Sequence, residues 1–207
     1  MIGGQVTANP NEANPLQTFL IYGLDADSKK ATWATHKKHK NDWISTFFKE
    51  ENPTSFEHIY PNLDWKIWQS PAPFQEIAAS NVQLISDSLL TDNQHLKSLD
   101  IQFGSFVNSM EFFLEKGSNI SRIQLNGFDI IPTPNKKDDE IYINFFSPHQ
   151  EGVNLTITTK NEAQKMRIVD RTIGLPIHLF PSPMPADRIH GPGGQSNVTL
   201  VRKSHTF

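Results

Sequence analysis

Short runs of alternating apolar and polar residues fill the middle of this sequence, and they constrain its fold more than any other feature. Leu99, Ile101 and Phe103 alternate with polar residues or glycine, and comparable runs recur up to residue 168. A period of two places successive side chains on opposite faces of a sheet. Short strands about 8–12 residues apart, with turn residues between them, favour a mainly β chain. We therefore expect an antiparallel β-sandwich, jelly-roll-like or immunoglobulin-like.

The dipeptide Asn126-Gly127 is the strongest turn signal in the chain. A tight two-residue turn needs positive φ at both central positions, which asparagine and glycine tolerate best. This dipeptide therefore predicts a hairpin between two short strands. Helical segments are few, and the fold is expected to hold one or two short helices. The best candidate covers residues 40–48, with its aromatic side chains on one side.

A single domain over residues 1–207 is expected, because this length supports one hydrophobic core. The domain is expected to begin with an irregular N-terminal part at residues 1–81. A block of core strands follows at 82–170, and a Pro-rich tail at 171–207. The first part is expected to hold two strands, over 16–22 and 31–35. Prolines exclude regular helix and central strand from the tail, so residues 198–204 are predicted to form a final edge strand.

Composition narrows the classes of partner and chemistry. The chain has 14 Phe and 4 Trp, and each buried aromatic side chain removes about 150–250 Å² from water. We therefore expect a core of aromatic and β-branched residues. The net charge of −3 argues against nucleic acid as a partner, because a polyanion needs a basic stripe. The absence of cysteine excludes a thiol nucleophile, a disulfide scaffold and any Cys-based zinc site.

No motif in the sequence predicts a catalytic or metal site. His36 and His39 are separated by two lysines, whereas a helical zinc-binding pair of this kind needs a glutamate to act as base. His149-Gln150-Glu151 matches the start of a zinc deaminase signature, which also requires cysteines. No Gly-x-Ser-x-Gly nucleophile elbow occurs. We therefore expect no catalytic residue, metal ligand or cofactor in this chain.

Two tryptophans are candidates for a binding surface. Trp65 and Trp68 lie among prolines and are expected to be partly exposed. An exposed aromatic patch usually marks a partner surface, and it can also serve as a platform for carbohydrate. Burial in the core is the alternative for both side chains.

Charged residues near the end of the last clear strand form a second candidate. Asp170 and Arg171 are adjacent, and Asp187 and Arg188 follow in the tail. Because arginine makes bidentate contacts with carboxylates, we expect these residues to pair with one another and to pin the tail to the sandwich. A ligand site formed by Asp170, Arg171 and Arg188 is the alternative.

A family resemblance rests on segments from both ends of the chain. Near the N-terminus these are FLIYGLDAD at residues 19–27 and ATWAT at 31–35. Near the C-terminus they are RIVDRTIGLP at 167–176, PSPMP at 181–185 and SNVTLV at 196–201. Together they resemble the C-terminal soluble domain of multi-spanning membrane zinc exopeptidases. This family includes proteins of the endoplasmic reticulum metallopeptidase and vacuolar membrane protease type and their bacterial relatives.

The resemblance implies a location and a set of partners. In this family a zinc peptidase domain and transmembrane helices precede a β-rich domain on the non-cytoplasmic side. Zinc would then be held by the peptidase domain of the parent, and no position of this chain matches the motif of its ligands. Family members often carry an acidic residue where this chain has Asn197, so no carboxylate role is carried over to that position.

Three functional hypotheses follow. The first is a non-catalytic extracytoplasmic domain, in a bacterial periplasm, tethered to the membrane through the parent and supporting its assembly or substrate access. Its partners would be the peptidase and transmembrane regions of the parent chain. The second is a freestanding β-sandwich module that binds carbohydrate or peptide. The third is an unrecognised hydrolase on a β scaffold. Fold alone does not separate them.

Overall fold

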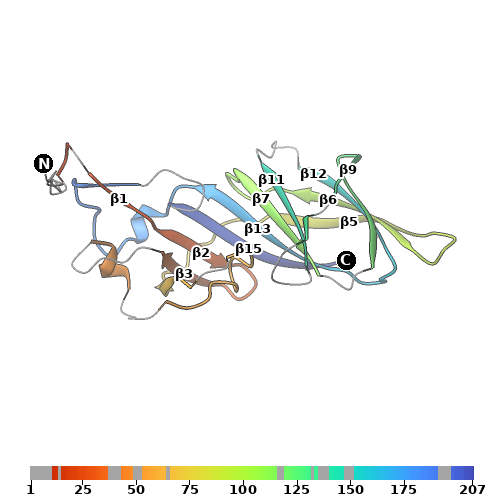
Figure 1. Ribbon diagram of the computed structural model, residues 1–207, viewed down its shortest axis with the longest axis horizontal. Helices are drawn as coiled ribbons and strands as arrows, with labels where there is room; N and C mark the ends of the chain where they lie inside the picture. Colours follow the sequence, from red (N-terminus) through yellow and green to blue (C-terminus); the bar gives the residue numbers. More distant parts are fainter. Residues whose placement is uncertain are drawn as a thin grey trace, which may run out of the picture.

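The structure, a computed structural model, is mainly β and confirms the predicted fold class (Figure 1). Two large sheets and one two-stranded sheet account for its strands. The residues that the structure describes are 11–13, 15–36, 43–48, 53–63, 66–115, 119–131, 133–134, 140–146, 152–190 and 197–207.

An eight-stranded sheet runs along the molecule. Its strands, in spatial order, are β10 (Thr133–Pro134), β11 (Ile141–Phe146), β7 (Ser109–Leu114), β13 (Lys165–Ile173), β15 (Val198–Thr206), β2 (Ile21–Asp25), β3 (Lys30–Thr35) and β4 (Trp68–Ala72). Every neighbouring pair is antiparallel except β15 and β2, which are parallel. Strands from the two ends of the chain therefore meet at the centre of this sheet.

A five-stranded antiparallel sheet covers one half of the long sheet. Its strands, in spatial order, are β5 (Asn81–Leu89), β6 (His95–Gln102), β12 (Val153–Thr159), β8 (Ile120–Leu125) and β9 (Phe128–Asp129). The hairpin predicted at Asn126-Gly127 joins β8 to β9, and both residues have positive φ, 49° and 80°. Apart from these sheets, β1 (Leu16–Thr18) pairs in parallel with β14 (Arg188–His190). The short helices are η1 (Trp43–Phe47) and η2 (Ile177–Leu179).

Side-chain alternation along the long sheet creates three apolar cores. Met166 and Ile168 of β13 face the five-stranded sheet and belong to the first core. Val169, between Ile168 and Asp170, points to the opposite face and packs under the segment of residues 53–67 in the second core. The third core lies over β2 and β3 and includes Trp33, which packs against Phe47 of η1 and Phe180 of the tail. Both faces of the long sheet are thus partly covered.

The prediction of a final edge strand over residues 198–204 is wrong. β15 lies in the middle of the sheet, between β13 and β2. Val198 and Leu200 pack in the second core and Val201 packs in the third. A strand buried on both faces carries a continuous apolar run instead of an alternating one. The prolines of the tail all precede this strand and therefore do not restrict it.

The described residues of the N-terminal part form four strands, so the prediction of two is also wrong. The strand expected over residues 16–22 is divided into β1 and β2, because Leu20 is held by Asn197. The Leu20 carbonyl accepts from the Asn197 amide at 2.6 Å, and the Asn197 side chain accepts from the Leu20 amide at 3.4 Å. β4 was not predicted because it contains Pro71, which it tolerates as an edge strand of the sheet.

Candidate functional site

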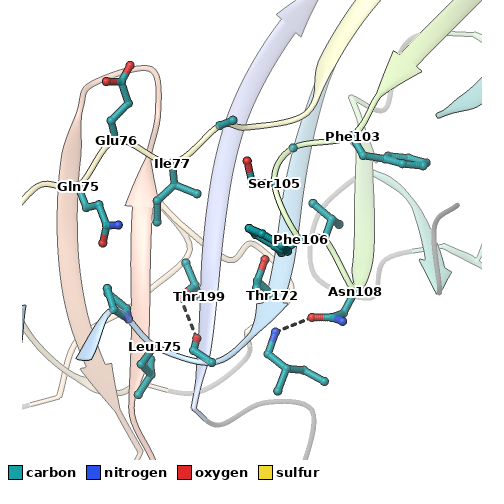
Figure 2. A pocket seen from close by; sticks show the side chains of 16 residues that line it. Gln75, Glu76, Ile77, Phe103, Ser105, Phe106, Asn108, Thr172, Leu175 and Thr199 are labelled. Atoms are coloured by element: carbon teal, nitrogen blue, oxygen red, sulfur yellow. Dashed lines mark hydrogen bonds between the residues drawn. The ribbon is translucent and has the colours of Figure 1, made fainter. Parts of the chain in front are cut away.

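A cleft of about 1010 Å³ lies where the five-stranded sheet meets the long sheet (Figure 2). Three segments line it: residues 75–78, which lead toward β5, residues 103–108, which join β6 to β7, and residues 172–176 at the end of β13. Thr199 of β15 completes the lining. Ligand sites are commonly clefts of about 300–1,000 Å³, so this cleft is large enough to hold a small molecule or a peptide segment.

Asp170 of β13 fixes the wall of the cleft next to β5. Its carboxylate accepts hydrogen bonds from the Ser80 amide at 2.6 Å and from the Ser80 hydroxyl at 2.7 Å. The Gly104 amide donates in turn to the Ser80 hydroxyl oxygen at 3.1 Å. Asp170 is 2% exposed, and burial raises the pKa of its carboxyl to about 6 although the bonds from Ser80 lower it. This cluster joins the two sheets at the edge of the cleft.

Asn108 and Thr199 hold the opposite wall. The Asn108 side-chain oxygen accepts from the Ile173 amide at 2.7 Å, and the Asn108 amide donates to the Arg171 carbonyl at 2.8 Å. The Thr199 hydroxyl donates to the Gly174 carbonyl at 2.9 Å. Figure 2 shows both side-chain bonds as dashed lines. Asn108, which immediately precedes β7, thus takes the place of a strand neighbour for the last residues of β13.

Phe106 is presented at the mouth of the cleft in an unusual backbone conformation. Its side chain is 87% exposed, and its φ is 58°. Positive φ is a genuine outlier for a bulky residue, and such outliers persist only where the surroundings enforce them, often at ligand sites. Gln75 contributes a buried side-chain oxygen, Oε1, that has no hydrogen-bond partner. The cleft therefore presents an exposed aromatic ring, and a residue of its wall holds a buried acceptor without a partner.

Arg171 points away from the cleft, into a buried polar cluster on the other face of the sheet. Its guanidinium lies 3.2 Å from Glu111 Oε1 and 5.4 Å from the centroid of the Tyr60 ring. The Tyr60 hydroxyl donates to the same Glu111 oxygen at 2.9 Å. Burial raises the pKa of Glu111, although the charge of Arg171 lowers it, and burial also raises the pKa of Tyr142 to about 12. This cluster secures the segment of residues 53–63 over the sheet.

The expected clamp of Asp170, Arg171 and Arg188 does not form. Asp170 binds Ser80, Arg171 binds Glu111, and Arg188 of β14 makes an ion pair of 2.7 Å with its neighbour Asp187. Neighbouring residues of a strand point to opposite faces, which separates Asp170 from Arg171. Asp170 does anchor a distant segment, but that segment precedes β5 and is not the tail.

Of the two candidate tryptophans, the structure describes Trp68 but not Trp65. Trp68 in β4 is half-buried and packs at the border of the third core. It lies outside the lining of the cleft. Trp65 lies outside the described residues.

The cleft residues Gln75, Phe106 and Asn108 were not predicted as functional. None belongs to a recognisable motif, and they meet only through the packing of the two sheets. An aromatic residue carries no sequence signal for positive φ, unlike asparagine or glycine.

A second charged cluster lies at the far end of β5 and β6. Lys97 is 1% exposed, and its Nζ donates to Asp87 at 2.7 Å and to the Glu162 carbonyl at 2.8 Å. His95 Nδ1 lies 2.9 Å from the other Asp87 oxygen. Hydrogen bonds to Lys97, the largest influence, and to His95 lower the pKa of Asp87. These contacts hold the turn between β12 and β13 against the hairpin formed by β5 and β6.

The described residues contain neither a cluster suited to a metal ion nor a helix suited to a membrane. In these ranges no group of three or more His, Asp or Glu side chains is arranged to hold a metal ion. None of the helices in the same ranges is long and apolar enough to cross a bilayer. Comparison of the chain with protein-family models, with curated proteins and with solved structures found no match.

Proposed function

We propose that this chain is a non-catalytic accessory domain of a membrane-bound zinc exopeptidase. One observation carries the proposal: the segments that resemble this family lie side by side. Residues 19–27 and 31–35 include β2 and β3, while 167–176 and 196–201 include most of β13 and the start of β15. These four strands are consecutive in the order β13-β15-β2-β3 at the centre of the long sheet (Figure 1).

The role of such a domain is structural support and substrate access. The zinc and the catalytic residues would belong to the peptidase domain of the parent, and this chain would contact that domain and the transmembrane region. The location would be extracytoplasmic, in a bacterial periplasm. The cleft beside Phe106 is the surface through which the domain would meet substrate or partner, because it exposes the apolar side chains of Phe106 and Ile173.

Cell fractionation tests this role. An antibody raised against the chain is expected to detect, in cells of the native host, a polypeptide larger than the chain itself. We expect it in the membrane fraction, released by detergent but not by high salt. Protease added to spheroplasts should destroy the antigen while a cytoplasmic marker survives. An antigen of the size of this chain in the soluble fraction would contradict the proposal.

A freestanding binding module for carbohydrate or peptide is the second candidate. The specific observation in its favour is the cleft itself, with the 87% exposed ring of Phe106 at its mouth. The measurement that separates the two candidates is again the size and location of the native polypeptide, because a freestanding module needs no membrane tether.

A further inference from the structure

The wall of the cleft formed by residues 75–79 has the properties of an unpaired strand. Glu76 and Ala78 are exposed while Ile77 and Ala79 are half-buried and pack against the third core. This alternation is that of an extended strand. The segment nevertheless belongs to none of the three sheets.

Main-chain hydrogen-bonding groups of this segment are unused. Within the described residues, the N–H groups of Glu76, Ile77, Ala78 and Ala79 donate to no protein acceptor. In the same ranges the carbonyls of Gln75, Glu76 and Ile77 accept from no protein donor. Only the Ala78 carbonyl is engaged, by the Ser105 amide at 3.3 Å. An extended segment presents alternate residues to its two edges, so two of these four residues can face any one added chain. Free N–H and C=O groups at such an edge are a template on which another extended chain can pair.

The opposite side of the cleft supplies contacts for side chains. Phe106 and Ile173 are 87% and 74% exposed. Exposed apolar side chains of this size can contribute to binding by burying their surface against a partner. Among the described residues that line the cleft, Glu76 is the only charged one, so an uncharged or basic ligand is favoured over an acidic one.

From these observations we propose that the cleft binds an extended peptide segment, which adds as a strand to residues 76–79 and places an apolar side chain against Phe106 and Ile173. This is the strand-addition mode, in which main-chain bonds provide affinity and alternate side chains provide specificity. A polysaccharide would satisfy fewer of these groups, because it has no repeating N–H and C=O pattern to match the free wall. The inference deepens the second candidate function and is equally compatible with a tethered domain that receives peptide substrate.

The first test compares two variants that each remove one exposed aromatic ring. Peptides are selected on the immobilised chain from a random phage-displayed library, synthesised with a fluorophore, and titrated by fluorescence polarisation. Phe106→Asn should weaken binding about tenfold or more, since an anchor contact of this kind contributes on the order of a factor of ten. Asparagine tolerates positive φ, so the variant should keep its fold. Phe128→Asn removes a ring that is 75% exposed on β9 and should change affinity less than twofold.

The second test examines the main-chain pairing without altering the protein. Two series of the selected peptide are made with N-methyl groups on alternate amides. In an added strand only one of the two sets of amides faces the domain. One series should therefore lose binding about tenfold or more, and the other should retain it.

Three outcomes would overturn the inference: no peptide is enriched over a mock-coated surface, Phe106→Asn binds as well as the parent chain, or both methylated series bind equally. Glycan-array binding that Phe106→Asn abolishes, without peptide binding, would also overturn it while leaving the binding-module proposal in place. If the proposal of a membrane-tethered domain is wrong, the cell fractionation will show it, whereas these peptide titrations will not.

Discussion

Replacing Arg171 with alanine is expected to lower the free energy of unfolding by about 3–5 kcal/mol. Among the residues that the structure describes, Arg171 is the only cationic partner of Glu111, which is 2% exposed. The truncated chain would retain a buried carboxylate whose remaining donors are the hydroxyls of Tyr60 and Tyr142. Removing one partner of a buried ion pair is costly because the other charge stays desolvated. Urea denaturation at neutral pH, followed by tryptophan fluorescence, measures the loss.

An exposed ion pair provides the control for this measurement. Arg122 contacts Asp129 at 2.7 Å, and their side chains are 57% and 59% exposed. Arg122→Ala should cost less than about 1 kcal/mol, because water solvates both charges. The double variant Arg171→Met with Glu111→Gln should recover most of the stability lost in Arg171→Ala, since it removes both buried charges. Equal losses for Arg171→Ala and Arg122→Ala would contradict the assigned role of the Glu111 cluster.

Asp170→Asn is expected to change how stability depends on pH. The Asp170 carboxyl titrates at a pKa of about 6 in the folded chain and near 4 when unfolded. Between about pH 4 and pH 6 the carboxyl is protonated in the folded chain and ionised in the unfolded chain. Its contribution to the free energy of unfolding therefore falls as pH rises. The fall amounts to about 2–3 kcal/mol across the interval, and the asparagine variant should lack it.

The readout is the difference between parent and variant curves from pH 4 to pH 7, measured by chemical denaturation at each pH. Burial lowers the pKa of His58 and of His205, which makes stability rise with pH, and the difference curve removes such shared contributions. Asp129→Asn, in the exposed pair, should leave the slope in this interval unchanged. Parallel curves for the parent chain and Asp170→Asn would show that the buried carboxyl does not titrate in this range.

Local periodicity explains how much of the fold could be predicted from the sequence. Alternating runs predicted the strands of the sandwich, and the Asn126-Gly127 turn was confirmed. Strand order was not predictable in this way. The parallel pairing of β15 with β2 joins residues about 180 positions apart, and no local pattern encodes it.

The candidate site was even less predictable from local sequence patterns than the strand order. Adjacent charges at Asp170 and Arg171 suggested one clamp, but a strand directs them to opposite faces, where each meets a different distant partner. The cleft depends on Gly104, where an added Cβ would lie 2.2 Å from the Ala78 carbonyl oxygen. That close approach brings residues 75–78 and 103–108 together and is a property of the packed sheets.

The most direct test of the proposed role is to isolate the native polypeptide from detergent-solubilised membranes with an antibody against this chain. The proposed role predicts that the isolated polypeptide contains zinc and releases N-terminal residues from short peptides, and that a zinc chelator abolishes this activity. The chain purified alone should show neither property. A native polypeptide without zinc and without peptidase activity would contradict the assignment to a membrane zinc exopeptidase.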